Sequence, residues 1–429
     1  MHHFHYHDGQ LHCEDVPLAR IAQEVGTPTY VYSRTTLNHH YRVFDEALAK
    51  SPHLICYSVK ANPNGAVLGS LAKLGAGADI VSGGELMRAL RAGIPGDRIV
   101  FSGVGKGADE MVEALDASIL MFNVESVAEL ELLSAVAQDR GVLAPVALRV
   151  NPDVDPMTHP FIATGLRKSK FGIPLHHAWE AYQQALELPG IEIRGIDCHI
   201  GSQLTSVEPL LASMRKMYEL VTKLRERDVE LRYLDVGGGL GIVYSDETPP
   251  SPADYGNAVA GLLDELNRGS QGATDDLTVI CEPGRVIMGN AGLLLGRVLY
   301  RKQNGQRQFV VVDTAMNDLL RPALYGAFHS IQPVKEQSAE RMAFGLVDIV
   351  GPVCESADFM AKERPMPPLE RDDLIAVMSC GAYGHGMASN YNSRRRPAEV
   401  LVEGDRYAVV RERESYEDLV RGESRPTWL

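Results

Sequence analysis

The sequence lacks paired cysteines. Its six cysteines are scattered and form no Cys-x-x-Cys pair, so neither a zinc site nor a disulfide framework is indicated, and we predict no bound metal. Three of them, Cys56, Cys198 and Cys281, lie inside apolar runs and are predicted to be small core residues. Free cysteines of this kind fit a reducing cytoplasm.

Long apolar runs and an excess of positive charge are also missing. No stretch approaches the roughly 20 apolar residues of a membrane span, and residues 1–8 lack the apolar core of a signal peptide. The histidines in that segment have no regular ligand spacing, which favours an ordinary N-terminus over a metal site or a tag. The formal net charge of −14 makes nucleic acid and anionic membranes poor partners.

Strand and helix patterns alternate from about residue 50 to 285. The length of 429 residues indicates two domains of ordinary size. Short apolar runs occur at 54–61, 78–82, 99–103, 119–124, 144–151, 193–200, 233–238 and 277–282, with amphipathic helical patterns between them. Eight such repeats predict a (β/α)8 TIM barrel in an α/β fold. A doubly wound open sheet is the alternative.

The alternation of strand and helix patterns ends after Arg285. Residues 293–300 and 308–313 are predicted strands joined through Asn304-Gly305, a hairpin signal. Further strands are expected at 347–350, 374–378 and 407–410, and residues 151–172 and 361–373 are expected to be long loops. We therefore predict a barrel at 33–285 and a mostly β C-terminal domain at 286–429, which the N-terminal segment 1–32 joins.

Lys60 ends the first apolar run of this alternating region. The run is short and β-prone, which predicts a buried strand, and Asn62-Pro63-Asn64-Gly65 then breaks it. An amine is thus placed at the carboxyl end of a strand, where α/β enzymes keep their chemistry. A desolvated lysine can form a Schiff base with a carbonyl. The alternative is a lysine snorkelling at a strand end.

Chemically useful residues also follow the other strands, whose carboxyl ends share one face of a barrel. These residues are Asp79, Ser82, Glu85, Arg149, Asn151, Asp197, His199, Ser202, Gly237, Gly238, Gly239, Glu282, Pro283, Gly284 and Arg285. Glycines let backbone N–H groups converge on an anion, and loops seven and eight of barrels often hold phosphate.

Together these residues fit a phosphorylated aromatic aldehyde, pyridoxal 5'-phosphate. Lys60 would bind the aldehyde and the glycines would bind the phosphate. His199 would stack on the ring, and Glu282 would contact a ring nitrogen. Taken singly, each has an ordinary alternative. The glycines would form a tight turn, His199 would be a satisfied core histidine, and Glu282 would pair with Arg285.

Several motifs resemble a known family. Residues 57–62, 199–203, 237–241 and 282–285 resemble the barrel-type pyridoxal-phosphate decarboxylases, which share the alanine racemase-like fold and include ornithine, arginine and diaminopimelate decarboxylases. Residues 159–165, 170–172, 351–358, 381–384 and 387–392 resemble the diaminopimelate decarboxylases among them, whereas His385-Gly386 departs from their pattern. The resemblance covers nearly the whole chain.

The resemblance implies a role for each matching residue. Lys60 would bind the cofactor covalently, His199 would stack on it, and Glu282 would keep its ring nitrogen protonated, where racemases of this fold have an arginine. The phosphate region would be bound by Ser202, Gly237, Gly238, Gly239, Pro283, Gly284 and Arg285. Tyr383 would contact both cofactor and substrate.

The resemblance also implies decarboxylation of meso-2,6-diaminopimelate to L-lysine and CO2, the last step of lysine biosynthesis. Arg285, Arg321 and Tyr325 would hold substrate carboxylates, because a guanidinium matches a carboxylate well. Glu355 would bind the distal ammonium, and Cys354 would protonate the carbon that loses CO2. In this family Cys354 and Glu355 come from the partner subunit, so we expect a homodimer with shared sites.

Other interpretations of the sequence remain open. An ornithine or arginine decarboxylase would not need Arg321 and Glu355 together. A non-catalytic pyridoxal-phosphate-binding protein usually has the barrel alone, and a racemase is disfavoured by Glu282. Without the surrounding motifs, Arg321 would be a surface ion-pair partner and Cys354 an inert thiol.

Overall fold

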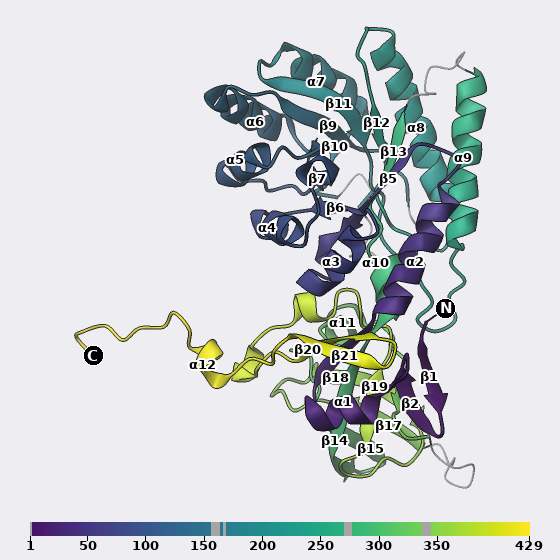
Figure 1. Ribbon diagram of the computed structural model, residues 1–429, viewed down its shortest axis with the longest axis vertical. Coiled ribbons are helices and arrows are strands. Elements are labelled where there is room, and N and C mark those ends of the chain that lie inside the picture. The colour runs from purple at the N-terminus through teal and green to yellow at the C-terminus, as the bar shows by residue number, and fades with distance from the viewer. Residues whose placement is uncertain (1, 156–163, 166–168, 270–276, 337–344) are drawn as a thin grey trace. The chain divides into compact units, whose positions relative to one another are not determined.

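The computed structural model describes residues 2–155, 164–165, 169–269, 277–336 and 345–429 (Figure 1). The chain divides into two compact units. The β unit comprises Met1–Leu37, Tyr244–Asp246 and Met288–Leu429, and the barrel unit comprises Asn38–Val243 and Glu247–Ile287. None of the helices in the described ranges has both the length and the apolar character needed to span a membrane.

Eight parallel strands close into a barrel in the described part of the barrel unit. They are β5 (His53–Ser58), β6 (Gly77–Ile80), β7 (Ile99–Phe101), β8 (Met121–Val124), β9 (Ala144–Asn151), β11 (Ile191–Asp197), β12 (Tyr233–Asp235) and β13 (Thr278–Cys281). Pairing of β8 with β9 and of β13 with β5 completes the ring, and the two-residue β10 (Ile173–Pro174) extends it beside β9. The predicted (β/α)8 barrel is confirmed, and the open-sheet alternative is wrong.

Helices surround these strands (Figure 1). They are α2 (Arg34–Ala47), α3 (Gly65–Ala72), α4 (Gly83–Arg91), α5 (Ala108–Asp116), α6 (Val127–Arg140), α7 (Leu175–Glu187), α8 (Glu208–Arg225), α9 (Pro252–Gly269) and the short α10 (Arg285–Met288). Serine side chains cap several N-termini: Ser82 accepts from the Glu85 N–H and Ser126 from the Glu129 N–H. Each cap starts a helix directly after a strand, which keeps the strand ends in fixed positions.

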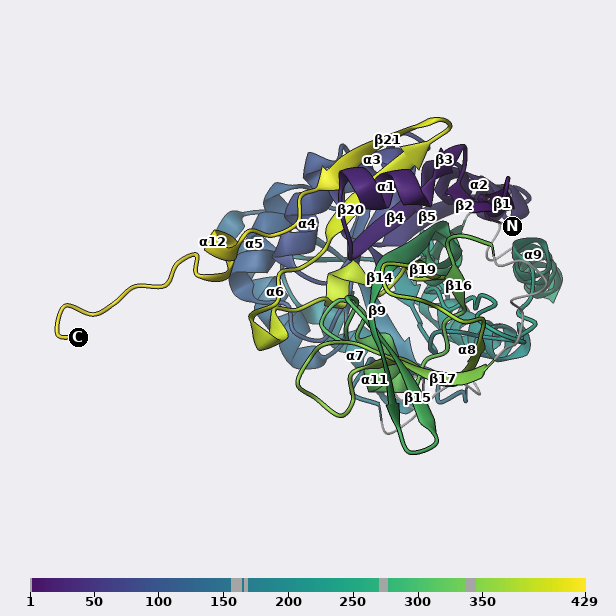
Figure 2. The same ribbon diagram turned by 90° about the horizontal axis from the view of Figure 1, so that it is seen from below.

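The β unit is built on a long, mostly antiparallel sheet. Its strands are β4 (Thr29–Ser33), β14 (Gly292–Asn304), β15 (Arg307–Val312), β16 (Ile331–Pro333), β17 (Gly345–Val350), β18 (Phe359–Met366), β19 (Leu374–Val377), β20 (Ala398–Glu403) and β21 (Arg406–Arg411). β14 and β15 form the hairpin that Asn304-Gly305 predicts, with Gly305 at a positive φ of 59° (Figure 2). The short helices of this unit are α1 (Leu18–Glu24), α11 (Arg321–Tyr325) and α12 (Tyr416–Leu419).

Several parts of the β unit differ from the prediction, and β16 and β20 were not among the predicted strands. Residues 361–366 were expected in a loop but belong to β18, an edge strand that pairs only with β17 in the described sheet. Edge strands tolerate charged residues and proline. The sequence Lys362-Glu363-Arg364-Pro365 therefore has the composition of a loop although it forms a strand. The small sheet of β1 (Phe4–His7), β2 (Gln10–Cys13) and β3 (Val16–Pro17) was not predicted at all.

Candidate active site

Lys60 lies just beyond the first barrel strand rather than inside it. β5 ends at Ser58, and Lys60 stands in a 3-10 turn, Val59–Ala61, with its side chain 39% exposed. The amine therefore lies at the carboxyl end of the strand, as predicted, but its side chain is not buried. Ser58 ends the strand because its N–H donates to the Pro283 carbonyl, and its hydroxyl lies 2.9 Å from two acceptors, Asp79 Oδ2 and the Glu282 carbonyl.

The amine of Lys60 is held by a buried carboxylate. Its Nζ lies 2.5 Å from Oδ2 of Asp79, which is fully buried on β6 and also accepts from Ser58. The other oxygen of Asp79 has no partner in the described structure. A solvent-accessible amine is thus fixed over the barrel by a charge-assisted bond.

His199 lies directly against the glycine run that follows β12. Its Nδ1 accepts a hydrogen bond from the Gly238 N–H at 3.2 Å, which leaves its proton on Nε2. Burial and the nearby charges of Arg149 and Lys60 hold the pKa of His199 well below its usual range. The ring is therefore neutral at physiological pH.

The glycine run is packed too tightly for side chains. A Cβ at Gly237 would lie 2.6 Å from Nδ1 of His199, and one at Gly238 would lie 2.1 Å from the Glu282 carbonyl oxygen. Gly237 and Gly239 also adopt positive φ values of 65° and 111°. These positions require glycine, as the sequence predicts.

The end of the last barrel strand adds a cation and a hydroxyl. Arg285 donates through Nε and Nη2 to the Ser202 Oγ, at 3.3 and 3.1 Å. Gly284 lies against the Lys60 turn, because a Cβ there would be 2.9 Å from the Ala61 Cβ. Arg285, Ser202 and the Lys60 turn therefore belong to the same end of the barrel.

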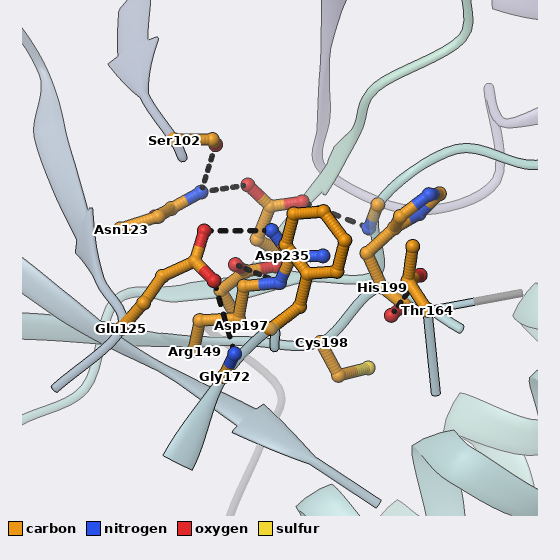
Figure 3. Close-up of polar contacts among 12 residues, drawn as sticks. Ser102, Asn123, Glu125, Arg149, Thr164, Gly172, Asp197, Cys198, His199 and Asp235 are labelled. Carbon is orange, nitrogen blue, oxygen red and sulfur yellow. Dashed lines mark hydrogen bonds and ion pairs between the residues drawn. The ribbon is translucent and has the colours of Figure 1, made fainter. Parts of the chain in front are cut away.

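Glu282 is buried among polar side chains from three other barrel strands, β7, β8 and β12. Its Oε1 accepts from the Ser102 hydroxyl at 3.1 Å and the Asn123 amide at 3.3 Å. The same amide nitrogen donates to Oδ2 of Asp235 at 3.1 Å (Figure 3). Burial raises the pKa of Glu282 to about 7, and the charge of Asp79 adds to the rise.

A buried ion pair lies beside this carboxylate. Arg149 donates from Nη1 to Oε1 of Glu125 at 2.8 Å, and its Nε lies 3.9 Å from Oδ2 of Asp197 (Figure 3). Its guanidinium also lies over the Phe171 ring, 5.0 Å from the centroid. Glu125 accepts in addition from the Gly172 N–H at 2.9 Å. The 170–172 motif is thereby tied to the barrel ends.

In the β unit, Arg321 is part of a buried polar cluster. It donates to the Tyr244 hydroxyl at 2.8 Å, lies 4.7 Å from the centroid of that ring, and is 3.4 Å from Nε2 of His329. His329 uses Nδ1 to contact the Met378 carbonyl at 2.8 Å. The surface ion pair considered for Arg321 is not what the structure contains.

The other β-unit candidates lie on turns and short elements. Tyr325 ends α11, and Tyr383 has a positive φ of 56°, which is rare for a side-chain-bearing residue. Cys354 and Glu355 are exposed, and the Cys354 N–H donates to Asn392. The motif at 159–165 lies outside the described residues except for Thr164 and Gly165.

The barrel strand ends bring together most of the predicted barrel residues and several that were not predicted. Ser102 and Asn123 donate to Glu282, and Glu125 accepts from Arg149. Ser102 and Glu125 directly follow β7 and β8, and Asn123 lies within β8. Applying the strand-end rule to these two strands would have found Ser102 and Glu125, but not Asn123.

The residues of this barrel end fit pyridoxal 5'-phosphate. They offer an accessible amine, a neutral imidazole, a buried carboxylate, and a serine and arginine beside a glycine run. The unpartnered oxygens of Asp79 and Asp197 show that the polar network is incomplete within the described residues. A phosphorylated aldehyde with a ring nitrogen matches this set of groups.

Comparison with known proteins agrees with this assignment. The sequence profile of the "Pyridoxal-dependent decarboxylase, pyridoxal binding domain" family matches residues 34–289. The chain therefore belongs to the pyridoxal-dependent decarboxylases, and its cofactor is pyridoxal 5'-phosphate.

Individual relatives show which members of this family the chain is similar to. Diaminopimelate decarboxylase of Pseudomonas aeruginosa is 51% identical over 421 residues, covering 98% of both chains. The structure of diaminopimelate decarboxylase from Helicobacter pylori, complexed with L-lysine, has a TM-score of 0.88 at 42% identity and covers 94% of this chain and 98% of that one. The M. jannaschii enzyme, also with L-lysine, has a TM-score of 0.93 at 37% identity and covers 99% and 98%. Within its family the chain groups with the diaminopimelate decarboxylases.

Proposed function

We propose that this protein converts meso-2,6-diaminopimelate to L-lysine and CO2 with the help of pyridoxal 5'-phosphate, as the last step of lysine biosynthesis. The observation that carries the proposal is the 51% identity to the Pseudomonas aeruginosa enzyme over 98% of both chains. The geometry of the barrel end supports it, because amine, imidazole, glycine run and buried carboxylate lie at adjacent strand ends.

Each barrel residue has a proposed task toward the cofactor. Lys60 binds the aldehyde covalently, and Asp79 keeps the amine in place until then. Ser202, Gly237, Gly238, Gly239, Pro283, Gly284 and Arg285 bind the phosphate region. His199 lies on the ring as a neutral imidazole, so it adds no second positive charge to the site.

Glu282 governs the chemistry that the ring can perform. When bound, pyridoxal phosphate supplies a ring that accepts the electron pair left by the departing CO2. A carboxylate beside the ring nitrogen favours the protonated ring. Ser102 and Asn123 orient Glu282 by donating to Oε1, which leaves Oε2 to face the nitrogen.

The remaining candidate residues are assigned to substrate recognition. Arg285, Arg321 and Tyr325 bind carboxylates, Glu355 binds the distal ammonium, Tyr383 contacts cofactor and substrate, and Cys354 donates the proton that replaces CO2. Arg321 suits this task, because Tyr244 and His329 hold its guanidinium in one orientation.

We also propose a homodimer in a reducing cytoplasm, with Cys354 and Glu355 acting in the partner's site. The exposure of both residues supports this arrangement. The domain division at residues 1–32, 33–285 and 286–429 remains part of the proposal. Mixing two inactive variants tests the shared site: K60A with C354A should restore about a quarter of the wild-type activity after random subunit exchange. No recovery in exchanged dimers would contradict it.

The activity is tested with a panel of substrates. The purified protein with pyridoxal phosphate is incubated with meso-diaminopimelate, lysine, ornithine or arginine, and the CO2 released is measured. We expect CO2 from diaminopimelate alone, no activity in K60A, and unchanged activity in the control K73A, which removes an exposed lysine. CO2 from ornithine and none from diaminopimelate would refute the proposed substrate.

A further inference from the structure

Three acidic side chains meet under the proposed ring site. Asp197, Asp235 and Glu282 are all buried, and one oxygen from each lies within 4.8 Å of one from each of the others. They come from the ends of β11 and β12 and from the residue after β13. Three ionised carboxylates at this separation in a barrel interior would repel one another strongly.

The nearby cations are engaged with other acids. Lys60 pairs with Asp79, and the closest acid to Arg149 is Glu125 at 2.8 Å, with Asp197 only at 3.9 Å. Farther out, Lys106 pairs with Glu129. Within the described ranges, neither Asp235 nor Glu282 forms an ion pair with lysine or arginine. The three carboxyl groups must therefore retain at least one proton among them.

Hydrogen bonds distinguish the three groups. Asp235 accepts at both oxygens, from the Gly237 N–H at 2.9 Å and the Asn123 amide at 3.1 Å. Glu282 accepts twice at Oε1, from Ser102 and Asn123. Donors aimed at a carboxylate favour its ionised form. The donors around Asp235 and Glu282 therefore oppose the burial that raises the pKa of both carboxyl groups.

Asp197 has no such donors. Its Oδ1 is buried without a partner in the described structure, and Oδ2 faces only Arg149 at a distance longer than a hydrogen bond. A protonated Asp197 would remove one of three negative charges, and its O–H would point a donor toward neighbouring carboxylate oxygens that lie within 4.8 Å. A protonated carboxyl therefore fits this position better than an ionised one.

We propose that Asp197 is a positioning residue that carries a proton in the working enzyme and donates it as a hydrogen bond within the cluster, so that Glu282 is free to be ionised toward the ring nitrogen. Burial and the neighbouring charge of Glu282 raise the pKa of Asp197 well above its usual range, and they raise the pKa of Asp235 as well, so the hydrogen bonds are what distinguish the two aspartates. The part that concerns the ring nitrogen rests on the proposed function; the protonation itself does not.

Infrared spectroscopy of the cofactor-free protein tests the protonation directly. The C=O stretch of a protonated carboxyl is recorded at pH 8 with ¹³C-labelled aspartate, which separates Asp197 from Glu282 and every other glutamate. We expect an aspartic-acid band in the wild type and its loss in D197N. No band in the wild type, or a band that survives D197N, would overturn the proposal, and the wild-type measurement stands even if D197N fails to fold.

Cofactor binding by matched amide variants gives a second readout. Asparagine at position 197 copies a protonated aspartic acid, so D197N should bind pyridoxal phosphate within about threefold of wild type. E125Q removes the charge that pairs with Arg149 and should weaken binding about tenfold or more. D235N should also weaken it, since an amide cannot accept from both Gly237 and Asn123.

The outcomes separate the two proposals. If D197N weakens binding as much as E125Q, Asp197 is ionised in the native protein and the inference is wrong. If wild type binds no pyridoxal phosphate while the infrared band is present, the proposed function fails and the protonation stands. The pH profile of kcat should keep its wild-type shape in D197N, and a shifted profile would count against a neutral Asp197.

Discussion

Removing Glu125 should destabilise the barrel severely. Its carboxylate accepts from Arg149 at 2.8 Å and from the Gly103 and Gly172 N–H groups at 3.0 and 2.9 Å. The Glu125 side chain is only 2% exposed and that of Arg149 is 8% exposed, so water cannot replace the lost bonds. Glu125→Ala leaves a buried guanidinium and two backbone donors without an acceptor.

The expected loss follows from that burial. Breaking a buried pair by deleting one partner typically costs about 3–5 kcal/mol. For a unit of this size, such a loss lowers Tm by roughly 6–20 °C. Differential scanning calorimetry of the cofactor-free protein measures it, with Glu131→Ala on the exposed face of α6 as the matched control, expected within about 0.5 kcal/mol of wild type.

The result that would refute this reasoning is specific. If the free energies of unfolding of Glu125→Ala and Glu131→Ala differ by less than about 1 kcal/mol, then Arg149 has found another partner or water, and its ion pair with Glu125 does not stabilise the fold. Glu125→Gln is informative alongside it, because it keeps one acceptor oxygen and loses the other acceptor and the charge. We expect its Tm between those of wild type and the alanine variant.

Three further predictions concern the glycine run, the cofactor-facing carboxylate and the substrate cation. Gly238→Ala places a Cβ 2.1 Å from the Glu282 carbonyl oxygen, so we expect loss of cofactor retention on gel filtration; retention equal to wild type would contradict the close packing. Glu282 binds its proton more tightly in the folded protein, where its pKa is about 7 against an ordinary 4.5. The free energy of unfolding of the cofactor-free protein should therefore fall as the pH rises from about 4.5 to 7 and then stay level. Denaturant titrations of Glu282→Gln should lack this part of the pH dependence. Arg321→Lys loses the planar fork that donates to Tyr244, so KM for diaminopimelate should rise about tenfold with a smaller change in kcat, and an unchanged KM would remove Arg321 from the substrate site.

The barrel was predictable because its signals are local. Each strand is a short apolar run, and capping serines such as Ser82 and Ser126 start helices directly after strands. The glycine run and Glu282 follow from the rule that the carboxyl ends of barrel strands share one face. These features need only sequence spacing and the period of each element.

The missed features depend on contacts between distant residues. The strand at Phe359–Met366 exists because β17 pairs with it, and its own charged residues give no such signal. Lys60 leaves the strand because Ser58 bonds to Pro283 and Asp79, which are far away in sequence. Asn123 is an ordinary strand residue until Asp235 and Glu282 are brought to its amide.

The glycine run links the proposed phosphate site to the proposed ring site through one backbone. Gly238 donates its N–H to His199, and its α-carbon packs on the Glu282 carbonyl, while Gly237 both donates to Asp235 and accepts from the Glu282 N–H. A shift of this turn would move the imidazole, the acid cluster and the anion-binding backbone together. Because these contacts are backbone hydrogen bonds at left-handed or crowded positions, no side chain could restore them. The requirement for glycine therefore extends beyond the phosphate, to the tautomer of His199 and the charge of Asp235.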